Sequence, residues 1–281
     1  MQNNKLYIII IVSLVVLASG LAYLNFGTIG TEVPYAVTTD STSNIAKPFD
    51  YDEYYIASRD TLSPLIKHQV DSLENLIKVD TSNYQATVLL VRTYDQAGLG
   101  LIAANYLQNI ATKLGDERSW FNAGFKFYDF AATTSDTSAQ VYASKKAIGA
   151  FEKVVSINEH NLEAKNAMAI CFVQNDLDVM RGVQLLKDVI SRDSNNVQAN
   201  YTLGMLSRRS GQWDKARTRF EKLTQLEPLN SEAYFYLGEA YTSLNMKKEA
   251  IVAYETSMNL ISDNESKREI KKLIDNLKQT K

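Results

Sequence analysis

The chain has 281 residues, of which 45% are hydrophobic and 22% are charged, and its formal net charge is −2. These values are ordinary for a globular protein of one or two domains, and a charge so close to zero gives no general reason to expect nucleic acid as a partner. The single cysteine, Cys171, excludes an intramolecular disulfide framework and any multi-cysteine metal site.

Residues 1–25 are predicted to form an N-terminal transmembrane anchor. The segment from Leu6 to Leu24 contains no charged residue. As a helix it would span roughly 28 Å at about 1.5 Å per residue, which is close to the thickness of the hydrocarbon core of a bilayer. A cleaved signal peptide with the small residues Ala18–Gly20 at its cleavage site is the alternative, but the apolar residues continue past that site.

The charges around this segment predict its orientation. Lys5 is the only positively charged side chain before it, and the next one is Lys47. Because positively charged flanks stay in the cytoplasm, we expect the N-terminus inside and the rest of the chain outside.

Residues 26–60 are predicted to be a flexible acidic tether. Their first half is rich in Thr, Ser and Gly without a hydrophobic period, and residues 27–60 carry a net charge of −4, from six acids against Lys47 and Arg59. The end of the segment is different, because aromatic and apolar residues crowd into it. These side chains either pack onto the first helices or form a short docking motif for a partner; they are Phe49, Tyr51, Tyr54, Tyr55 and Ile56.

The remainder, residues 61–281, is predicted to be helical throughout. Ser63 and Pro64 suit a helix cap and first helical position, and an apolar stripe from Leu65 to Ile77 follows with the helical period. From Tyr84 onward the helices come in pairs. The predicted pairs cover about residues 84–116, 117–161, 163–196, 197–230 and 231–264, and a capping helix covers 266–279. The second pair contains about eleven extra residues, which we place in the loop Ala132–Ser138.

Two of these pairs repeat one pattern at a spacing of 34 residues. Leu203-Gly204 recurs as Leu237-Gly238, Ala216 as Ala250 and Phe220 as Tyr254, while Pro228 closes the first copy. The small residues let two antiparallel helices approach closely, and the large ones, with Tyr241, fill the space between pairs.

This pattern resembles the tetratricopeptide repeat, in which W-x2-L-G-x2-Y is followed by a small residue, an aromatic residue and a proline. The resemblance implies an all-α fold. We expect a right-handed superhelix, or α-solenoid, of about four to five helix pairs with a C-terminal capping helix, preceded by the transmembrane helix.

In such a superhelix the first helix of each pair lines a concave groove, and aromatic and amide side chains there suit an extended or helical peptide. Alternatively, half of these rings are ordinary packing between helices. Arg208 and Arg209 either pair an acidic ligand or form a solvated basic turn. The predicted groove residues are Phe121, Asn122, Phe125, Tyr128, Gln174, Tyr201, Met205, Arg208, Arg209, Phe235, Tyr236 and Glu239.

No pattern for catalysis is present in the sequence: it has no glycine-rich phosphate loop, no His or Cys cluster and no nucleophile beside a base. We therefore predict a protein that is not an enzyme and has no cofactor or metal. Its general layout resembles the small membrane-anchored repeat proteins of bacterial envelopes, particularly those of Bacteroidota.

The resulting hypothesis is a scaffold or adaptor in the bacterial cytoplasmic (inner) membrane. It would span the membrane once, with its repeats on the periplasmic side, and bind an unknown protein or peptide but no nucleic acid. Three alternatives stay open: an assembly chaperone resembling the repeat domain of cytochrome c maturation factors, a structural envelope protein that self-associates through its terminal helices, and an array that faces the cytosol.

Overall fold

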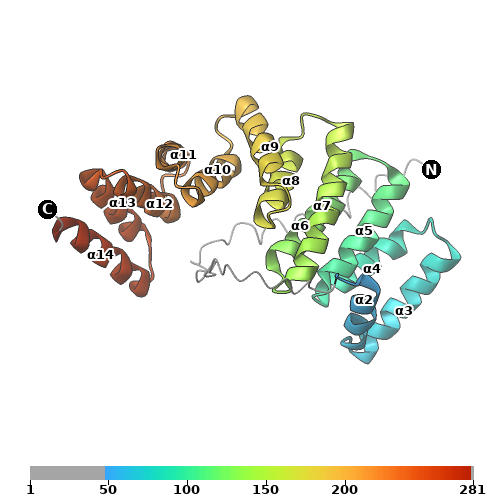
Figure 1. Ribbon diagram of the computed structural model, residues 1–281. Helices are drawn as coiled ribbons and strands as arrows, with labels where there is room; N and C mark the ends of the chain where they lie inside the picture. The colour runs from blue at the N-terminus through green and yellow to red at the C-terminus, as the bar shows by residue number, and fades with distance from the viewer. Residues whose placement is uncertain (1–47, 280–281) are drawn as a thin grey trace. The chain divides into compact units, whose positions relative to one another are not determined.

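The computed structural model describes residues 48–279, and every regular element in this range is an α-helix (Figure 1). The predicted anchor, residues 1–25, lies outside the described residues and stays a prediction. Among the helices of residues 48–279, none combines the length and the apolar character that a membrane crossing requires. The described chain divides into two compact units between Ala167 and Met168, within one helix, and each unit is treated by itself below.

The first unit contains six complete helices and the start of a seventh. These are α2 (Tyr51–Asp60), α3 (Pro64–Val79), α4 (Tyr84–Gln96), α5 (Gly100–Leu114), α6 (Glu117–Thr133), α7 (Thr137–Ile157) and the first turns of α8 (Leu162–Gln174). Consecutive helices from α3 to α7 pack against each other.

The second unit contains the rest of α8 and the regular pairs. Its helices are α9 (Val179–Arg192), α10 (Val197–Arg209), α11 (Trp213–Leu226), α12 (Ser231–Ser243), α13 (Lys247–Leu260) and α14 (Asn264–Gln279). The last of these is the predicted capping helix, which begins two residues earlier than expected.

In every pair except α6–α7, the turn inside the pair is built around one residue with a left-handed backbone. Gly98, Asp176, Gly211 and Asn245 have φ angles of 76°, 48°, 69° and 60°. Each lies fourteen residues after the first residue of its pair's first helix, in α4, α8, α10 and α12. Glycine, asparagine and aspartate adopt this conformation at the lowest cost, so the repeat places them at this point.

Close approach within a pair explains the repeated glycines. A Cβ atom added at Gly204 would lie 2.9 Å from the Phe220 ring, and one at Gly238 would lie 2.7 Å from the Tyr254 ring. Both rings are buried. A side chain at either glycine would therefore push the two helices of the pair apart.

The third repeat has its small residue on the other helix. Ile170 stands where the pattern has glycine, and it is buried. Gly182 of α9 compensates, because a Cβ atom there would lie 2.9 Å from the backbone oxygen of Ala169 and 2.8 Å from the side chain of Val173. The two helices of a pair can thus approach closely when the small residue lies on either of them.

The predicted loop insertion at Ala132–Ser138 is wrong, because the extra residues are helical. Helices α6 and α7 have 17 and 21 residues, against 13 and 14 in α10 and α11, so the two helices absorb all eleven. The turn between α6 and α7 is as short as in the regular pairs. Alanines are the best helix formers, and the Asp136 side chain caps α7 by accepting from the backbone N–H groups of Ser138 at 2.8 Å and Ala139 at 3.1 Å.

The extended α6–α7 hairpin receives part of the predicted tether. Residues 51–60 are not flexible but form α2, whose Tyr51 ring stacks on Tyr142 at 6.0 Å and whose Tyr54 ring meets Phe130 edge-on at 6.3 Å. Phe49 also contacts Tyr142, at 4.9 Å. Of the two alternatives, the structure shows packing onto the helices for the four aromatic rings, whereas Ile56 is 63% exposed.

The apolar stripe predicted for α3 is only partly a core stripe. Val70 and Leu73 are buried, but Leu65 is 77% and Leu76 is 52% exposed. Helix α3 is packed against α4 on one side, so the edge of its apolar face turns to solvent.

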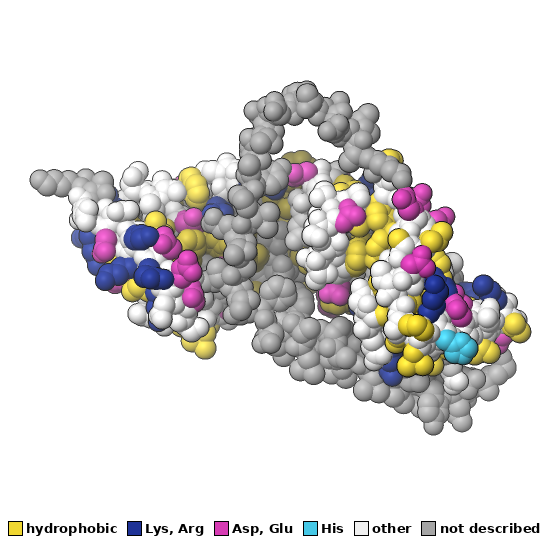
Figure 2. All heavy atoms as spheres, turned by 90° about the horizontal axis from the view of Figure 1, so that it is seen from below, with side chains coloured by type: hydrophobic (Ala, Val, Ile, Leu, Met, Phe, Trp, Pro, Cys, Tyr) yellow, Lys and Arg dark blue, Asp and Glu magenta, His cyan; other side chains and the backbone are white. Residues whose placement is uncertain are grey.

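Helix α14 covers the other end of the repeats. Ile270 and Ile274 are buried against Ala250 and Tyr254 of α13. Figure 2 shows dark-blue and magenta side chains mixed over the α14 end of the second unit. These exposed charges suit a helix that caps the repeats of the second unit.

Candidate functional site

Every residue predicted for the groove lies on the first helix of a pair. These residues are divided between the two units. Phe121, Asn122, Phe125 and Tyr128 lie on α6 in the first unit. The second unit holds Gln174 at the end of α8, then Tyr201, Met205, Arg208 and Arg209 on α10 and Phe235, Tyr236 and Glu239 on α12. A single groove through both units stays a prediction, and each surface is described separately.

Three rings form an aromatic stripe along α6, and we call Phe121, Phe125 and Tyr128 the α6 stripe. Their ring centroids are 6.3 Å apart for the first two and 6.2 Å apart for the last two. All three are partly exposed. Phe121 also packs edge-on against the buried ring of Phe151 at 5.8 Å, so the stripe is fixed to the core at one end.

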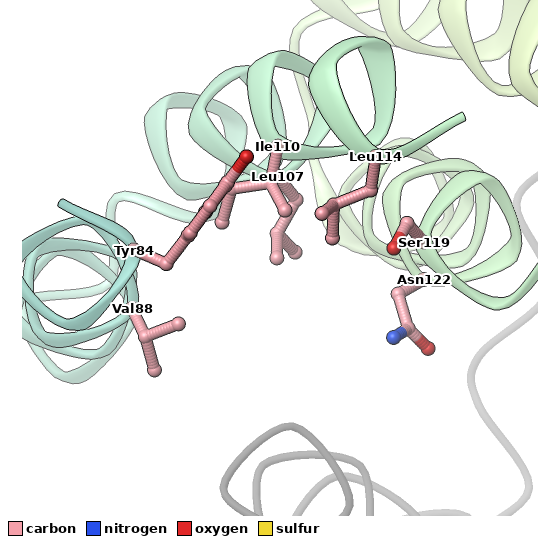
Figure 3. A pocket seen from close by; sticks show the side chains of 7 residues that line it. All are labelled: Tyr84, Val88, Leu107, Ile110, Leu114, Ser119 and Asn122. Atoms are coloured by element: carbon pink, nitrogen blue, oxygen red, sulfur yellow. The ribbon is translucent and has the colours of Figure 1, made fainter. Parts of the chain in front are cut away.

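Asn122 does not belong to this stripe but to a separate cleft. The cleft lies between the first helices α4 and α6, with α5 at its base, and we call it the α4–α6 cleft. Figure 3 shows Asn122 on one wall and Val88 on the opposite wall, with α5 side chains between them. The lining residues are Tyr84, Val88, Leu107, Ile110, Leu114, Ser119 and Asn122.

In the second unit, three partly exposed apolar side chains form what we call the α10–α12 patch: Tyr201, Met205 and Phe235. The Tyr201 hydroxyl donates a hydrogen bond to Glu232 Oε1 at 2.9 Å, which ties α10 to α12. Phe235 contacts the buried Tyr254 ring at 5.7 Å. The patch is therefore a firm surface rather than a set of loose side chains.

Arg208 is neither a solvated turn residue nor an open ligand site. Its Nε and an Nη atom donate to the two carboxylate oxygens of Glu239, at 2.6 and 3.1 Å. Its guanidinium also lies over the Tyr236 ring, 5.0 Å from the centroid. Arg209, which is more exposed, pairs with Asp176 at 3.5 Å. The ion pair between Arg208 and Glu239 was not predicted from the sequence because the two residues are 31 positions apart.

The Tyr236 side chain packs inside the repeat rather than forming part of the exposed surface for a partner. Its ring lies 5.4 Å from the buried Phe220. Burial raises the pKa of its hydroxyl to about 12, with a further contribution from the Glu232 carboxylate that Arg208 partly offsets. Burial and the Glu232 carboxylate also raise the pKa of Tyr201 above its ordinary value. Both tyrosines are thus neutral hydrogen-bond donors at physiological pH.

A polar cluster around Glu74, which we call the Glu74 cluster, was not predicted from the sequence. The hydroxyls of Tyr55, Tyr94 and Tyr106 donate to its Oε1 at 2.6, 2.9 and 2.8 Å. Arg59 donates to its other oxygen and also pairs with Asp71. One signal was present, since Glu74 interrupts the apolar positions of α3 and a buried carboxylate needs partners.

The hydrogen bonds decide the protonation state of Glu74. Burial by itself raises the pKa of a carboxyl group, but the bonds from Tyr55, Arg59, Tyr106 and Tyr94 outweigh it and hold the pKa of Glu74 below its ordinary value. The cluster joins α2 to α3, α4 and α5, so its role is structural.

Metal ligands do not gather in the described range: residues 48–279 contain no group of three or more His, Cys, Asp or Glu side chains that could hold an ion. Cys171 is buried there.

Comparisons with known proteins identify the repeat. Family models of the tetratricopeptide repeat match residues 198–230 and 231–264, the two copies that share the 34-residue pattern. The chain therefore carries tetratricopeptide repeats. Among curated proteins, no relative matches the sequence.

Solved structures of repeat proteins share the fold. A crystal structure of MamA has a TM-score of 0.51 at 18% identity and covers 61% of this chain and 94% of its own. MamA from Desulfovibrio magneticus RS-1 gives 0.51 at 16%, covering 63% and 93%. YrrB, a TPR protein, gives 0.50 at 15%, covering 72% and 99%. The predicted all-α repeat fold is thereby confirmed, and at these identities the likeness extends to the fold alone.

Proposed function

We propose that this protein is a non-catalytic scaffold that binds a protein or peptide through the first helices of its repeats. The observation that carries the proposal is the set of large side chains that these helices leave partly exposed, in the α6 stripe and the α10–α12 patch. Aromatic and methionine side chains on a rigid framework are typical of protein-binding surfaces. YrrB, which shares the fold, is described as a TPR protein with an unusual peptide-binding site.

The proposal includes attachment to a membrane. The uncharged segment from Leu6 to Leu24 supports it, and Lys5 before that segment supports an orientation with the repeats on the periplasmic side of a bacterial inner membrane. Deleting residues 1–25 should then move the protein from the membrane to the soluble fraction. Protease added to spheroplasts should degrade the full-length chain; protection from it would place the repeats in the cytosol.

Site-specific photocrosslinking in cells tests which surface binds. A photoreactive phenylalanine analogue at Phe125 or Met205 should form adducts with a partner. The control position is Val252, which is 62% exposed on the second helix α13. Adducts at Val252 and none at Phe125 or Met205 would show that the wrong face has been assigned.

Self-association is a second candidate, favoured by one observation. Leu65, Leu76 and Val79 are 77%, 52% and 90% exposed and lie on one face of α3. Substituting Leu76 and Val79 with Ser and comparing sedimentation with the wild type tests it. A wild-type chain that stays monomeric at high concentration excludes self-association.

A further inference from the structure

The α4–α6 cleft has an apolar interior with two polar groups at its walls. Val88, Leu107, Ile110 and Leu114 supply the apolar surface, while Tyr84 and Asn122 come from opposite sides (Figure 3). Neither the Tyr84 hydroxyl nor the Asn122 amide bonds to another side chain or backbone group of residues 48–279. Both are thus available to a ligand.

Two arginines flank the cleft. Arg92 follows Val88 by four residues on α4, and Arg118 precedes Asn122 by four residues on α6, so each lies one helical turn from a cleft residue and on the same face. Both are exposed, and within the described range neither forms an ion pair.

The acids near the cleft are held by other groups. Glu117 accepts from the side-chain amides of Asn158 and Asn161 at 2.9 and 2.8 Å. Asp116 caps α6 by accepting from the Ser119 N–H at 2.9 Å, and Asp95 pairs with Lys126. The charged groups beside the cleft that form no ion pair within residues 48–279 are therefore the guanidinium groups of Arg92 and Arg118, which complement carboxylates.

We propose that the α4–α6 cleft binds an acidic segment of a partner protein and takes one of its apolar side chains. Asn122 and Tyr84 hydrogen-bond to the backbone of that segment, and Arg92 and Arg118 pair with its Asp or Glu side chains. This rests on the proposed scaffold function and names the chemistry of the partner. Alternating acidic and apolar residues are what such a site would select.

The dimensions of the cleft favour a side chain over a small molecule. Its cavity volume is about 30 Å³, far below the roughly 300–1,000 Å³ of pockets that enclose drug-sized ligands. A small molecule of that size could therefore not be enclosed in the cleft. An extended chain that inserts one side chain and runs on across the surface fits this shape.

A peptide library tests the proposal. The full chain in detergent micelles is used to select from phage-displayed random dodecapeptides, and the selected peptides are measured by fluorescence anisotropy. We expect Leu, Ile, Met or Phe flanked by at least two acids. Affinity should fall about tenfold when Arg92 and Arg118 are replaced with Glu, and it should also fall with rising salt, since such contacts are screened.

Two further variants identify the site itself. Val88→Trp fills the cleft without changing charge, and Asn122→Ala removes the backbone contact; both should weaken binding while circular dichroism stays unchanged. The variant Met205→Ala with Phe235→Ala reports separately on the α10–α12 patch. The matched control is Val252→Ala, at an exposed position on α13 outside both surfaces, which should bind like the wild type. Peptides without acids, or peptides that bind Val88→Trp normally, overturn the proposal.

The same variants separate the cleft from the broader function. Peptides that lose affinity only in the Met205→Ala and Phe235→Ala variant would refute the cleft and leave the scaffold proposal standing. If no peptide is selected, the cleft proposal is overturned, and the crosslinking at Phe125 and Met205 then decides the scaffold proposal separately.

Discussion

Substituting glycine with alanine should have opposite effects at two helical positions. At Gly238 the new Cβ atom would lie 2.7 Å from two ring atoms of Tyr254, well inside the usual contact distance of about 3.5–4.0 Å. The ring is 3% exposed and packs against Ile270, so it cannot swing away. At Gly149, inside α7, a Cβ atom would meet nothing within 4 Å.

The magnitudes follow from these contacts. Overpacking costs about 1–3 kcal/mol, and alanine gains about 1 kcal/mol over glycine within a helix. The contact at Gly238 is severe, so Gly238→Ala should lower the free energy of unfolding by about 1–2 kcal/mol after the helical gain is subtracted. Gly149→Ala should raise it by about 0.5–1 kcal/mol because only the helical gain applies.

The two tryptophans make this measurable in each unit. Trp120 lies in the first unit and Trp213 in the second. Urea unfolding followed by fluorescence in a Trp120→Phe background reports on the second unit, and in a Trp213→Phe background on the first. If Gly238→Ala were as stabilising as Gly149→Ala, the close approach of α12 and α13 could not be the reason for the repeated glycine.

Three further predictions concern the interactions that the structure revealed. Glu74→Gln should destabilise the first unit by about 2–4 kcal/mol at neutral pH, since charged hydrogen bonds within a buried cluster are replaced by neutral ones. Because the pKa of Glu74 is lowered in the folded state, this contribution is present above the carboxyl's unfolded pKa and is lost as the pH falls through the folded one. Unfolding curves of the wild type and the variant should therefore converge in acid, while the exposed Glu163→Gln should matter little at any pH. Tyr142→Ala removes two ring contacts with the α2 segment, worth about 0.5–1.5 kcal/mol each, so amide hydrogen exchange across residues 51–60 should accelerate; unchanged exchange there, as expected for the control Lys145→Ala, would mean that the hairpin does not hold α2. Arg208→Glu should destabilise the second unit through repulsion of Glu239, and adding Glu239→Arg should restore most of the loss in the same urea assay; a double variant no better than the single one would contradict the ion pair.

Much of the fold was available from the sequence because the repeat is local. The spacing of Gly204, Ala216 and Phe220 recurs along one stretch of chain, and short-range periodicity determines which residues face a helix's own partner. The same phase placed Phe125 and Tyr201 on first helices. Helix existence and pairing could therefore be predicted.

Only the tertiary structure decided which polar residues were engaged. Arg208 meets Glu239 31 positions away, and Glu74 meets tyrosines from three other helices. The place of the eleven extra residues was also decided by the structure. The short polar stretch between α6 and α7 predicts a loop, but the two helices are longer instead, and their rings Phe130 and Tyr142 pack against α2. A helical period predicts which side chains of one helix face the core. The hydrogen-bond or ion-pair partner of a polar side chain, in contrast, often lies on a helix that is distant in the sequence. For that reason the sequence determined the repeat, and the packing of its helices decided which side chains remain for a partner.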